Sequence, residues 1–130
     1  MKELKEVIKR LQKKYRLHAI LLFGSRARGD WGPWSDYDLL IIADFKEKYL
    51  DRIDDILKLL KDIRLPIEPH PYTLKEALEM LRKGNPTIVD ALEEGVLLFK
   101  GNGYKLLWET YNQLKKRGLR RTRTSIKLPS

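Results

Sequence analysis

The stretch that decides the fold runs from Phe23 to Ile42 and reads FGSRARGDWGPWSDYDLLII. One apolar run, 17–23, ends directly before its Gly-Ser step, and a second, 36–43, begins at its two aspartates. Short, nearly all-apolar runs bounded by glycine or polar residues are typical of β-strands that are covered on both faces. The stretch therefore predicts two buried strands joined by a polar loop.

Helical patterns surround these two strands. Leu4, Val7, Ile8 and Leu11 recur at the i, i+3, i+4, i+7 spacing of one helical face. Two further helices carry start signals, a Thr-x-x-Glu capping box at Thr73 and an Asn-Pro step at residues 85–86. Spacing and caps together predict helices over the ranges 2–14, about 53–63, about 74–83, 86–94 and 104–117.

The segment LPIEPHPYT, residues 65–73, is extended but rich in proline. Proline has no N–H to donate to a ladder, so we expect an irregular strand at a sheet edge. A short strand, VLLF, follows Gly95. The order of elements predicts an α/β (α+β) domain, a small mixed sheet of about four strands with helices packed on it.

Size and composition indicate one domain. The chain has 130 residues, 42% of them hydrophobic, and no cysteine, which excludes disulfides and thiolate zinc sites. Its longest apolar runs are far shorter than the roughly 20 residues that cross a bilayer, and the charged N-terminus does not resemble a secretory signal. We expect a soluble, cytoplasmic protein without a membrane partner. The charged fraction of 35%, rich in Lys and Glu, is typical of a thermophile.

The net charge of +9 is concentrated at the C-terminal end. No acid follows Glu109, while seven basic residues do, which are Lys115, Lys116, Arg117, Arg120, Arg121, Arg123 and Lys127. We therefore expect a domain at 1–118 and a basic tail at 119–130 that does not fold by itself. Such a tail can bind nucleic acid, but without interleaved aromatic residues it fits a docking segment or a solvated run equally well.

Asp36 and Asp38 carry the first chemical signal. Alternate residues of a strand share a face, so these two carboxylates point the same way, about 7 Å apart along the strand. Such a pair repels itself unless a hard cation such as Mg²⁺ lies between or beside the groups. The pair therefore predicts a divalent metal site.

Gly24 and Ser25 carry the second signal, since they directly follow the first strand. Glycine lets the backbone approach a ligand, serine offers a hydroxyl, and a helical turn beginning there directs free N–H groups at an anion. Arg26 and Arg28 add positive charge nearby, and we favour a phosphate-binding role for at least one of them, although one can equally pair with a nearby acid. Phosphate at one end and metal at the other predict a nucleoside triphosphate bound as its magnesium complex.

Phosphoryl transfer with two metals usually needs a further carboxylate to activate the attacking hydroxyl. Glu68 is the candidate, as the acid of the third strand-like segment. It would lie beside the aspartates if the two segments are neighbours in the sheet. His70 is two residues further on and would share the face of Glu68 in a regular strand, but we prefer a structural role for it, and His18 carries no functional signal. Trp31 and Trp34 can stack on a base, cover the loop or face a partner.

The stretch GSRARGDWGPWSDYDLLII resembles the G-S-x10-D-x-D signature of the DNA polymerase beta-like nucleotidyltransferase superfamily, with similarity over about residues 15–100. The chain looks most like its minimal nucleotidyltransferases, the antitoxin partners of HEPN-domain proteins. The resemblance implies that Gly24 and Ser25 hold the triphosphate. It also implies that Asp36 and Asp38, with Glu68 in the third acidic position, bind two Mg²⁺ ions, for which Mn²⁺ can substitute. Glutamate replaces the commoner aspartate there.

The sequence leaves three functions open. The first is an enzyme that transfers AMP, or another nucleoside monophosphate, from ATP to a hydroxyl of a HEPN partner protein as the antitoxin of a toxin-antitoxin pair. The second is an antitoxin that acts by occlusion with a weakened site, which the glutamate at 68 would explain. The third is transfer to RNA or a small molecule, suggested by the basic tail. The base preference, the acceptor and the oligomeric state stay open.

Overall fold

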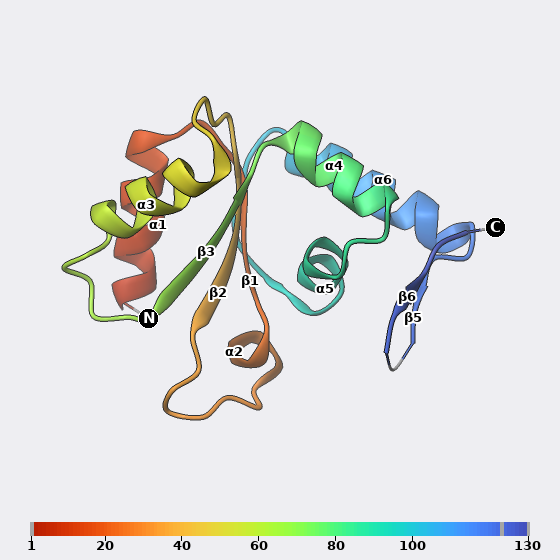
Figure 1. Ribbon diagram of the computed structural model, residues 1–130, viewed down its shortest axis with the longest axis horizontal. Coiled ribbons are helices and arrows are strands. Elements are labelled where there is room, and N and C mark those ends of the chain that lie inside the picture. The colour runs from red at the N-terminus through yellow and green to blue at the C-terminus, as the bar shows by residue number, and fades with distance from the viewer. Residues whose placement is uncertain (1, 123, 130) are drawn as a thin grey trace.

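The computed structural model describes residues 2–122 and 124–129. The helices in this part of the chain are α1 (Lys2–Lys14), α2 (Ser25–Arg28), α3 (Tyr49–Leu59), α4 (Leu74–Arg82), α5 (Pro86–Glu94) and α6 (Tyr104–Lys116). The strands are β1 (Leu17–Phe23), β2 (Tyr37–Ala43), β3 (Ile67–Tyr72), β4 (Val96–Lys100), β5 (Arg120–Arg121) and β6 (Ile126–Lys127) (Figure 1). The predicted α/β class is confirmed. None of the described helices has the length and apolar character that a membrane span requires.

Four strands form the central sheet in the order β3-β2-β1-β4. β1 pairs antiparallel with both β2 and β4, whereas β2 and β3 are parallel. A parallel pair needs a crossover, and α3 supplies it. The sheet is therefore mixed, as predicted, and the two strands of the opening stretch occupy its centre.

Helices cover both faces of this sheet. In Figure 1, α1 and α3 lie on one side of it and α4, α5 and α6 on the other. Alternate residues of each central strand pack into the two cores, Ile20 and Leu22 of β1 with α1, and Ala19 and Leu21 with the second group of helices. Because both faces of β1 and β2 are apolar along their length, polar groups are confined to the strand ends. The ends of these strands are thus where a site can lie.

The predicted boundaries of α4 and α5 are reproduced by local capping. The range predicted for α3, about 53–63, is wrong, because no side-chain cap marks the start of that helix and apolar spacing alone does not fix it. Thr73 accepts a hydrogen bond from the backbone N–H of Glu76, and the Glu76 side chain accepts one from that of Thr73, so the capping box is complete. The side chain of Asn85 accepts from the first turn of α5, and Gly95 ends that helix. These signals act over three or four residues, which is why the sequence reveals them.

The prolines of β3 sit where they disturb the sheet least. β3 is an edge strand, as expected, and it pairs with β2 along its whole length. The Tyr37 N–H donates to Pro66 O at 2.8 Å, so residues 66, 68, 70 and 72 turn their backbone groups toward β2. Pro69 and Pro71 face the open edge, where a missing N–H costs the ladder nothing and discourages pairing with another chain.

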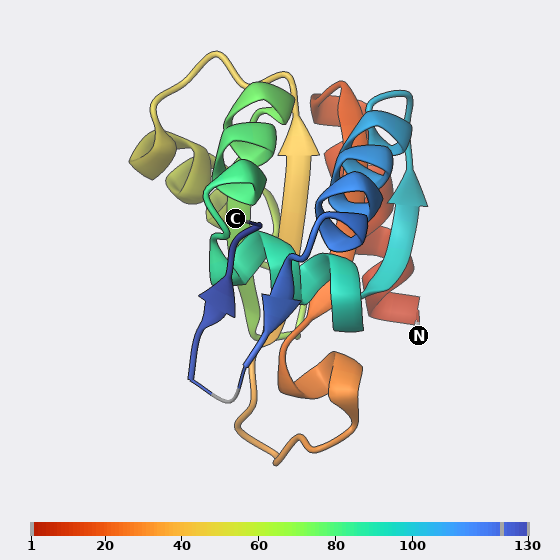
Figure 2. The same cartoon turned by 90° about the vertical axis from the view of Figure 1, so that its right-hand side faces the viewer.

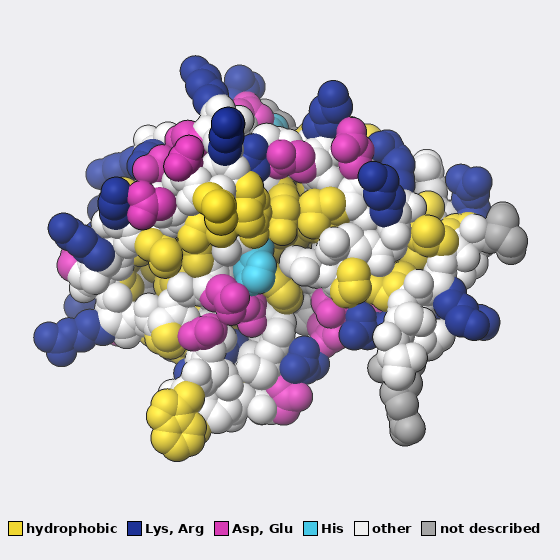
Figure 3. All heavy atoms as spheres, in the orientation of Figure 1, with side chains coloured by type: hydrophobic (Ala, Val, Ile, Leu, Met, Phe, Trp, Pro, Cys, Tyr) yellow, Lys and Arg dark blue, Asp and Glu magenta, His cyan; other side chains and the backbone are white. Residues whose placement is uncertain are grey.

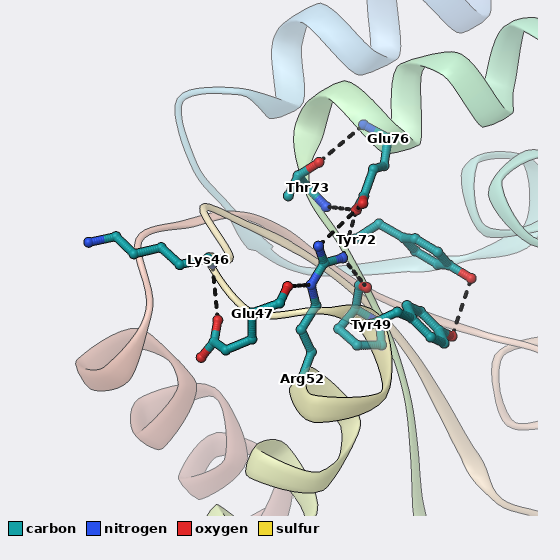
Figure 4. Close-up of polar contacts among 8 residues, drawn as sticks. Lys46, Glu47, Tyr49, Arg52, Tyr72, Thr73 and Glu76 are labelled. Carbon is teal, nitrogen blue, oxygen red and sulfur yellow. Dashed lines mark hydrogen bonds and ion pairs between the residues drawn. The ribbon is translucent and has the colours of Figure 1, made fainter.

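Arg52 of α3 ties this edge strand to the helices around it (Figure 4). Its guanidinium donates to both carboxylate oxygens of Glu76, at 2.7 and 3.2 Å, and to the carbonyl of Pro71 at 3.4 Å. Its Nε donates to the carbonyl of Glu47 at 2.8 Å. The residue is only 6% exposed. One buried charge therefore joins α3, β3 and the first turn of α4.

The segment that we predicted as a basic tail, 119–130, is folded in its described part. β5 and β6 form an antiparallel hairpin, which lies beside α5 in Figure 2. Leu119 is only 3% exposed, Ile126 packs on the core, and Arg121 pairs with Asp90 of α5. Two-residue strands carry no readable periodicity, so only packing reveals them. Arg123, which we counted in the basic run, lies outside the described residues.

Candidate active site

The predicted site residues meet at one end of the sheet. β1 and β2 are antiparallel, so the end of β1 lies beside the beginning of β2, with Phe23 opposite Asp38. β3 runs parallel to β2, with Glu68 opposite Asp38. The Gly-Ser step, the aspartates and the third acid thus come from three adjacent strand ends, and the neighbourhood on which the Glu68 assignment depended is present.

Gly24 lies close to Asp38, and both its backbone conformation and this closeness favour glycine. Its φ of 76° is a conformation that side chains rarely adopt. A Cβ built at this position would lie 2.5 Å from Oδ2 of Asp38. The absence of a side chain leaves room for the carboxylate, so the Gly24-Ser25 loop and Asp38 belong to one site.

Ser25 begins the short helix α2. Within it, the N–H groups of Ala27 and Arg28 both donate to Gly24 O at 3.1 Å. By helix geometry the N–H groups of Ser25 and Arg26 precede the first acceptor and have no partner within the helix. The backbone directly after β1 therefore offers donors near the acids, as an anion requires.

Asp38, Glu68 and His70 converge. One ligand atom from each can be chosen so that all three lie within 4.8 Å of one another. Nε2 of His70 is 3.2 Å from Oδ1 of Asp38. Figure 3 shows acidic side chains gathered beside a histidine, below a band of hydrophobic side chains, on an open face of the molecule. Two carboxylates and one imidazole at this spacing are a donor set that fits a divalent cation.

The neighbours of Glu68 raise its pKa. A hydrogen bond with Asp38 raises this pKa most, followed by burial and by the negative charge of Asp38. The charge of His70 acts in the opposite direction and lowers the pKa. The two carboxyl groups thus favour sharing a proton. A divalent cation would relieve the same repulsion, which is a second reason that these residues fit a metal.

Asp36 lies at the exposed mouth of the site, one residue before β2. It is not one of the three residues that converge within 4.8 Å, but its charge contributes to the raised pKa of Glu68, so it lies within electrostatic reach. Of the two predicted aspartates, Asp38 is the one that the structure places in the close group.

Arg26 and Arg28 both have partners within the protein. The Arg26 guanidinium lies 4.2 Å from the ring centre of Trp31 and 4.4 Å from that of Tyr37, and its Nε donates to Ser35 O at 3.1 Å. Arg28 pairs with Asp30 at 3.2 Å and with Glu94 at 3.5 Å. Arg26 thus holds the loop between the two motifs, while Arg28 makes exposed pairs that an anion can replace.

The two tryptophans differ in their packing, so they fit different roles among those that the sequence left open. Trp31 covers Arg26 and so belongs to the loop. Trp34 is 89% exposed at the tip of that loop. An indole with so little packing of its own is available to a ligand or a partner.

The histidines differ from each other. His18 lies at the far end of β1, where Nε2 is 2.7 Å from Oδ1 of Asp44 and Nδ1 accepts from the Gly103 N–H at 3.1 Å. These contacts join β1 to Asp44 and to the residue before α6. His70, for which we preferred a structural role, stands instead in the acidic group. Its i, i+2 spacing from Glu68 on a strand was the signal for a shared face.

The sequence matches a known family over most of its length. Residues 2–98 match the model of the family described as nucleotidyltransferase domain. A candidate protein adenylyltransferase of Methanocaldococcus jannaschii is 46% identical over 61 residues, which make up 45% of this chain and 59% of that protein. A bifunctional uridylyltransferase/uridylyl-removing enzyme of Pseudomonas entomophila is 36% identical over 77 residues, 58% of this chain but 9% of that enzyme.

Solved structures share the fold. A chain of a toxin-antitoxin crystal structure with AMP-PNP aligns with a TM-score of 0.58 at 17% identity, over 89% of this chain and 88% of that one. A chain of the complex of tri-AMPylated Shewanella oneidensis HEPN toxin with MNT antitoxin aligns with a TM-score of 0.51 at 16% identity. The alignment covers 88% of this chain and 85% of that one. At these identities the likeness establishes the architecture.

Proposed function

Because this chain belongs to the nucleotidyltransferase domain family, we propose that it transfers AMP from ATP to a hydroxyl of a HEPN partner protein, as the antitoxin of a toxin-antitoxin pair. The observation that carries the proposal is the meeting of the Gly24-Ser25 loop with Asp38 and Glu68 at one end of the sheet. The similarity to the candidate protein adenylyltransferase of Methanocaldococcus jannaschii supports adenylyl transfer to protein, and the AMPylated HEPN toxin of the similar complex supports the partner.

The residues take separate roles in this proposal. Gly24 and the free N–H groups of α2 hold the triphosphate, with the Ser25 hydroxyl and the positive charge of Arg28 and Arg26 nearby. Asp36, Asp38 and Glu68 are the carboxylates that would hold two Mg²⁺ ions. When bound, these ions would supply electrostatic stabilisation of the phosphate charge. The close approach of Gly24 to Asp38 keeps phosphate and carboxylate sites adjacent.

The transfer itself exchanges one bond for another. The acceptor oxygen forms a bond to the α-phosphorus of ATP, the bond from that phosphorus to the oxygen bridging to the β-phosphate breaks, and pyrophosphate leaves with the electron pair. The hydroxyl proton must go to a base. Glu68 is the carboxylate that we assign to accept it, because it lies on the strand next to β2, opposite Asp38.

Labelled ATP, magnesium and the HEPN partner test this function. We expect the wild-type protein to label the partner and the double variant Asp36→Asn with Asp38→Asn to label it at background level. A double variant with the same change of charge, Asp51→Asn with Asp54→Asn on the exposed side of α3, should label normally. Equal labelling by the Asp36/Asp38 variant would exclude the proposed mechanism.

If the protein is instead an antitoxin that acts by occlusion, neutralisation of the partner should not depend on the two aspartates. The Asp36/Asp38 double variant would then still neutralise its partner. The register of Glu68 with Asp38 favours the enzyme over this alternative, because a glutamate in the third acidic position still reaches the acidic group. Toxicity of the partner in cells that carry the double variant distinguishes the two functions.

A further inference from the structure

His70 lies with Asp38 and Glu68 in the group whose ligand atoms converge, but the proposed function gives it no role. Its ring lies against Phe23, with centroids 5.0 Å apart in an edge-to-face arrangement, and its side chain is 20% exposed. Phe23 is itself buried in the core. The imidazole is thus held in place on one side and directed toward Asp38 and Glu68 on the other.

We propose that His70 supplies a nitrogen ligand to the metal at the Asp38–Glu68 site and thereby makes this site prefer Mn²⁺ over Mg²⁺. The inference rests on the proposed function only in placing a metal among these residues. The geometry that points to it is the strand spacing of Glu68 and His70, the register of Asp38 with Glu68, and the 4.8 Å limit that encloses all three ligand atoms.

The chemical reason is the contrast between oxygen and nitrogen donors. Mg²⁺ binds oxygen ligands and keeps much of its water, so a site of carboxylates alone suits it. Imidazole is a ligand of first-row transition metals. Mn²⁺ binds it most weakly of that series and also takes carboxylates, but it accepts a nitrogen donor more readily than Mg²⁺ does, so a mixed nitrogen and oxygen set favours Mn²⁺ over Mg²⁺. A histidine in reach of two carboxylates therefore changes which ion the site prefers, without changing the charge of the carboxylates.

A competing role for His70 is to orient Asp38 through the observed contact of 3.2 Å without touching the metal. Partners of this kind also raise metal affinity, but they act through the carboxylate and so affect every cation that it binds. Direct ligation and positioning are therefore separable. The first affects Mn²⁺ much more than Mg²⁺, and the second affects both alike.

The test measures metal binding by the purified protein without nucleotide or partner. Calorimetry with Mn²⁺ and with Mg²⁺ gives the two affinities, and electron spin echo modulation of bound Mn²⁺ detects a coordinated imidazole nitrogen. We expect wild-type protein to bind Mn²⁺ about tenfold more tightly than Mg²⁺ and to show nitrogen modulation. In His70→Leu the modulation should vanish, and the Mn²⁺ affinity should fall about tenfold while that for Mg²⁺ changes less than about twofold.

Two controls make the result specific. His18→Asn removes the other histidine, at the far end of β1, and should retain the wild-type affinities and the modulation. Asp38→Asn should weaken both ions. The melting temperature of each variant shows that it is folded. Absence of nitrogen modulation in the wild type, equal losses of both ions in His70→Leu, or no binding of either ion would overturn the proposal.

Failure of the proposed function has a different signature. If Mn²⁺ binds with a coordinated nitrogen but no partner is labelled, the ligand role of His70 stands and the assigned reaction does not. If the partner is labelled and no nitrogen is detected, the reaction stands and His70 is not a ligand.

Discussion

The backbone conformation of Gly24 and its contact with Asp38 both require a residue without a side chain. Its positive φ favours glycine, and its missing side chain leaves room for the carboxylate of Asp38. Two other glycines separate these effects. Gly29 also has a positive φ, 85°, but nothing lies near the position of a Cβ, while Gly32 has neither constraint. The three positions therefore form a graded series.

We expect Gly29→Ala to lower the free energy of unfolding by about 1 kcal/mol, the usual cost of a left-handed conformation for a residue with a side chain. Gly24→Ala should cost more, because Asp38 must also move, and it should weaken divalent metal binding. Gly32→Ala should have little effect. Chemical denaturation and metal titration of the three variants measure this. A Gly24→Ala variant as stable as Gly29→Ala, with unchanged metal affinity, would contradict the close contact.

At the scale of the element, β3 matters because it carries Glu68 and His70 although it lies at the edge of the sheet. Its prolines leave the outer edge without donors, and only one neighbouring strand holds it. Arg52 compensates by joining the Pro71 carbonyl to α3 and to Glu76 at the beginning of α4. The geometry of the acidic group thus depends on a network at the other end of the strand.

Arg52→Met should therefore destabilise the protein by about 2 kcal/mol, since hydrogen bonds to charged groups contribute about 1.5–3 kcal/mol and the Glu76 carboxylate stays partly hydrated. Lys58→Met is the matched control. It removes an exposed pair with Asp54 on the same helix and should change stability by less than about 0.5 kcal/mol. Urea unfolding compares the two. Equal effects would show that Arg52 is an ordinary surface charge.

Glu76 predicts a pH dependence with a defined sign. Its pKa is lowered from 4.5, first by the hydrogen bond with Arg52 and further by its bond to the backbone of Thr73. The folded state therefore prefers the ionised form, and the resulting stability is complete well above pH 4.5. It is lost as the pH falls from 4.5 through the lowered pKa.

Glu76→Gln removes the charge but keeps an acceptor for the helix cap. We expect the variant to melt below the wild type at neutral pH, and the difference to shrink as the pH falls below about 4. Thermal melts across this range test the prediction. A difference that is constant with pH would mean that the carboxylate charge does not matter.

At the scale of the whole molecule, two apolar cores lie on opposite faces of one sheet, and the C-terminal hairpin closes the second of them. Leu119 joins the core shared by α4, α5 and α6, and Gly84 lies so close to Leu128 that a Cβ there would be 2.9 Å from its Cδ2. The basic residues of the hairpin are thus displayed on a packed element. Truncation after Gly118 would remove part of the core along with the charge.

Leu119→Ala should lower the free energy of unfolding by about 2–4 kcal/mol, as expected when a buried leucine is truncated. Leu106→Ala, on the exposed side of α6, should change it by less than about 0.5 kcal/mol. Denaturant titration of both variants measures the contrast. Similar small effects would mean that the segment after Gly118 is a free tail, as the sequence predicted.

Removal of charges from the hairpin tests RNA binding better than truncation does, because truncation also removes part of the core. Arg120→Gln with Lys127→Gln removes two exposed charges of the hairpin and leaves Leu119 in place. If RNA is a substrate, wild-type protein should bind it with a steep salt dependence that this variant reduces. No binding at low salt would exclude that role.

The sequence by itself determined most of the helices and strands, and it contained both motifs of the candidate site. Periodicity, the capping box at Thr73, the cap at Asn85 and the Gly-Ser and Asp-x-Asp motifs all act over a few residues, so each is legible without the fold. Only the tertiary structure decided that β3 lies parallel to β2 with Glu68 opposite Asp38, that His70 joins them, that Arg26 is held by Trp31 and Tyr37, and that the C-terminal segment folds as a hairpin. These features depend on which strands and faces meet across long separations in the chain, and packing of the two cores settles that choice.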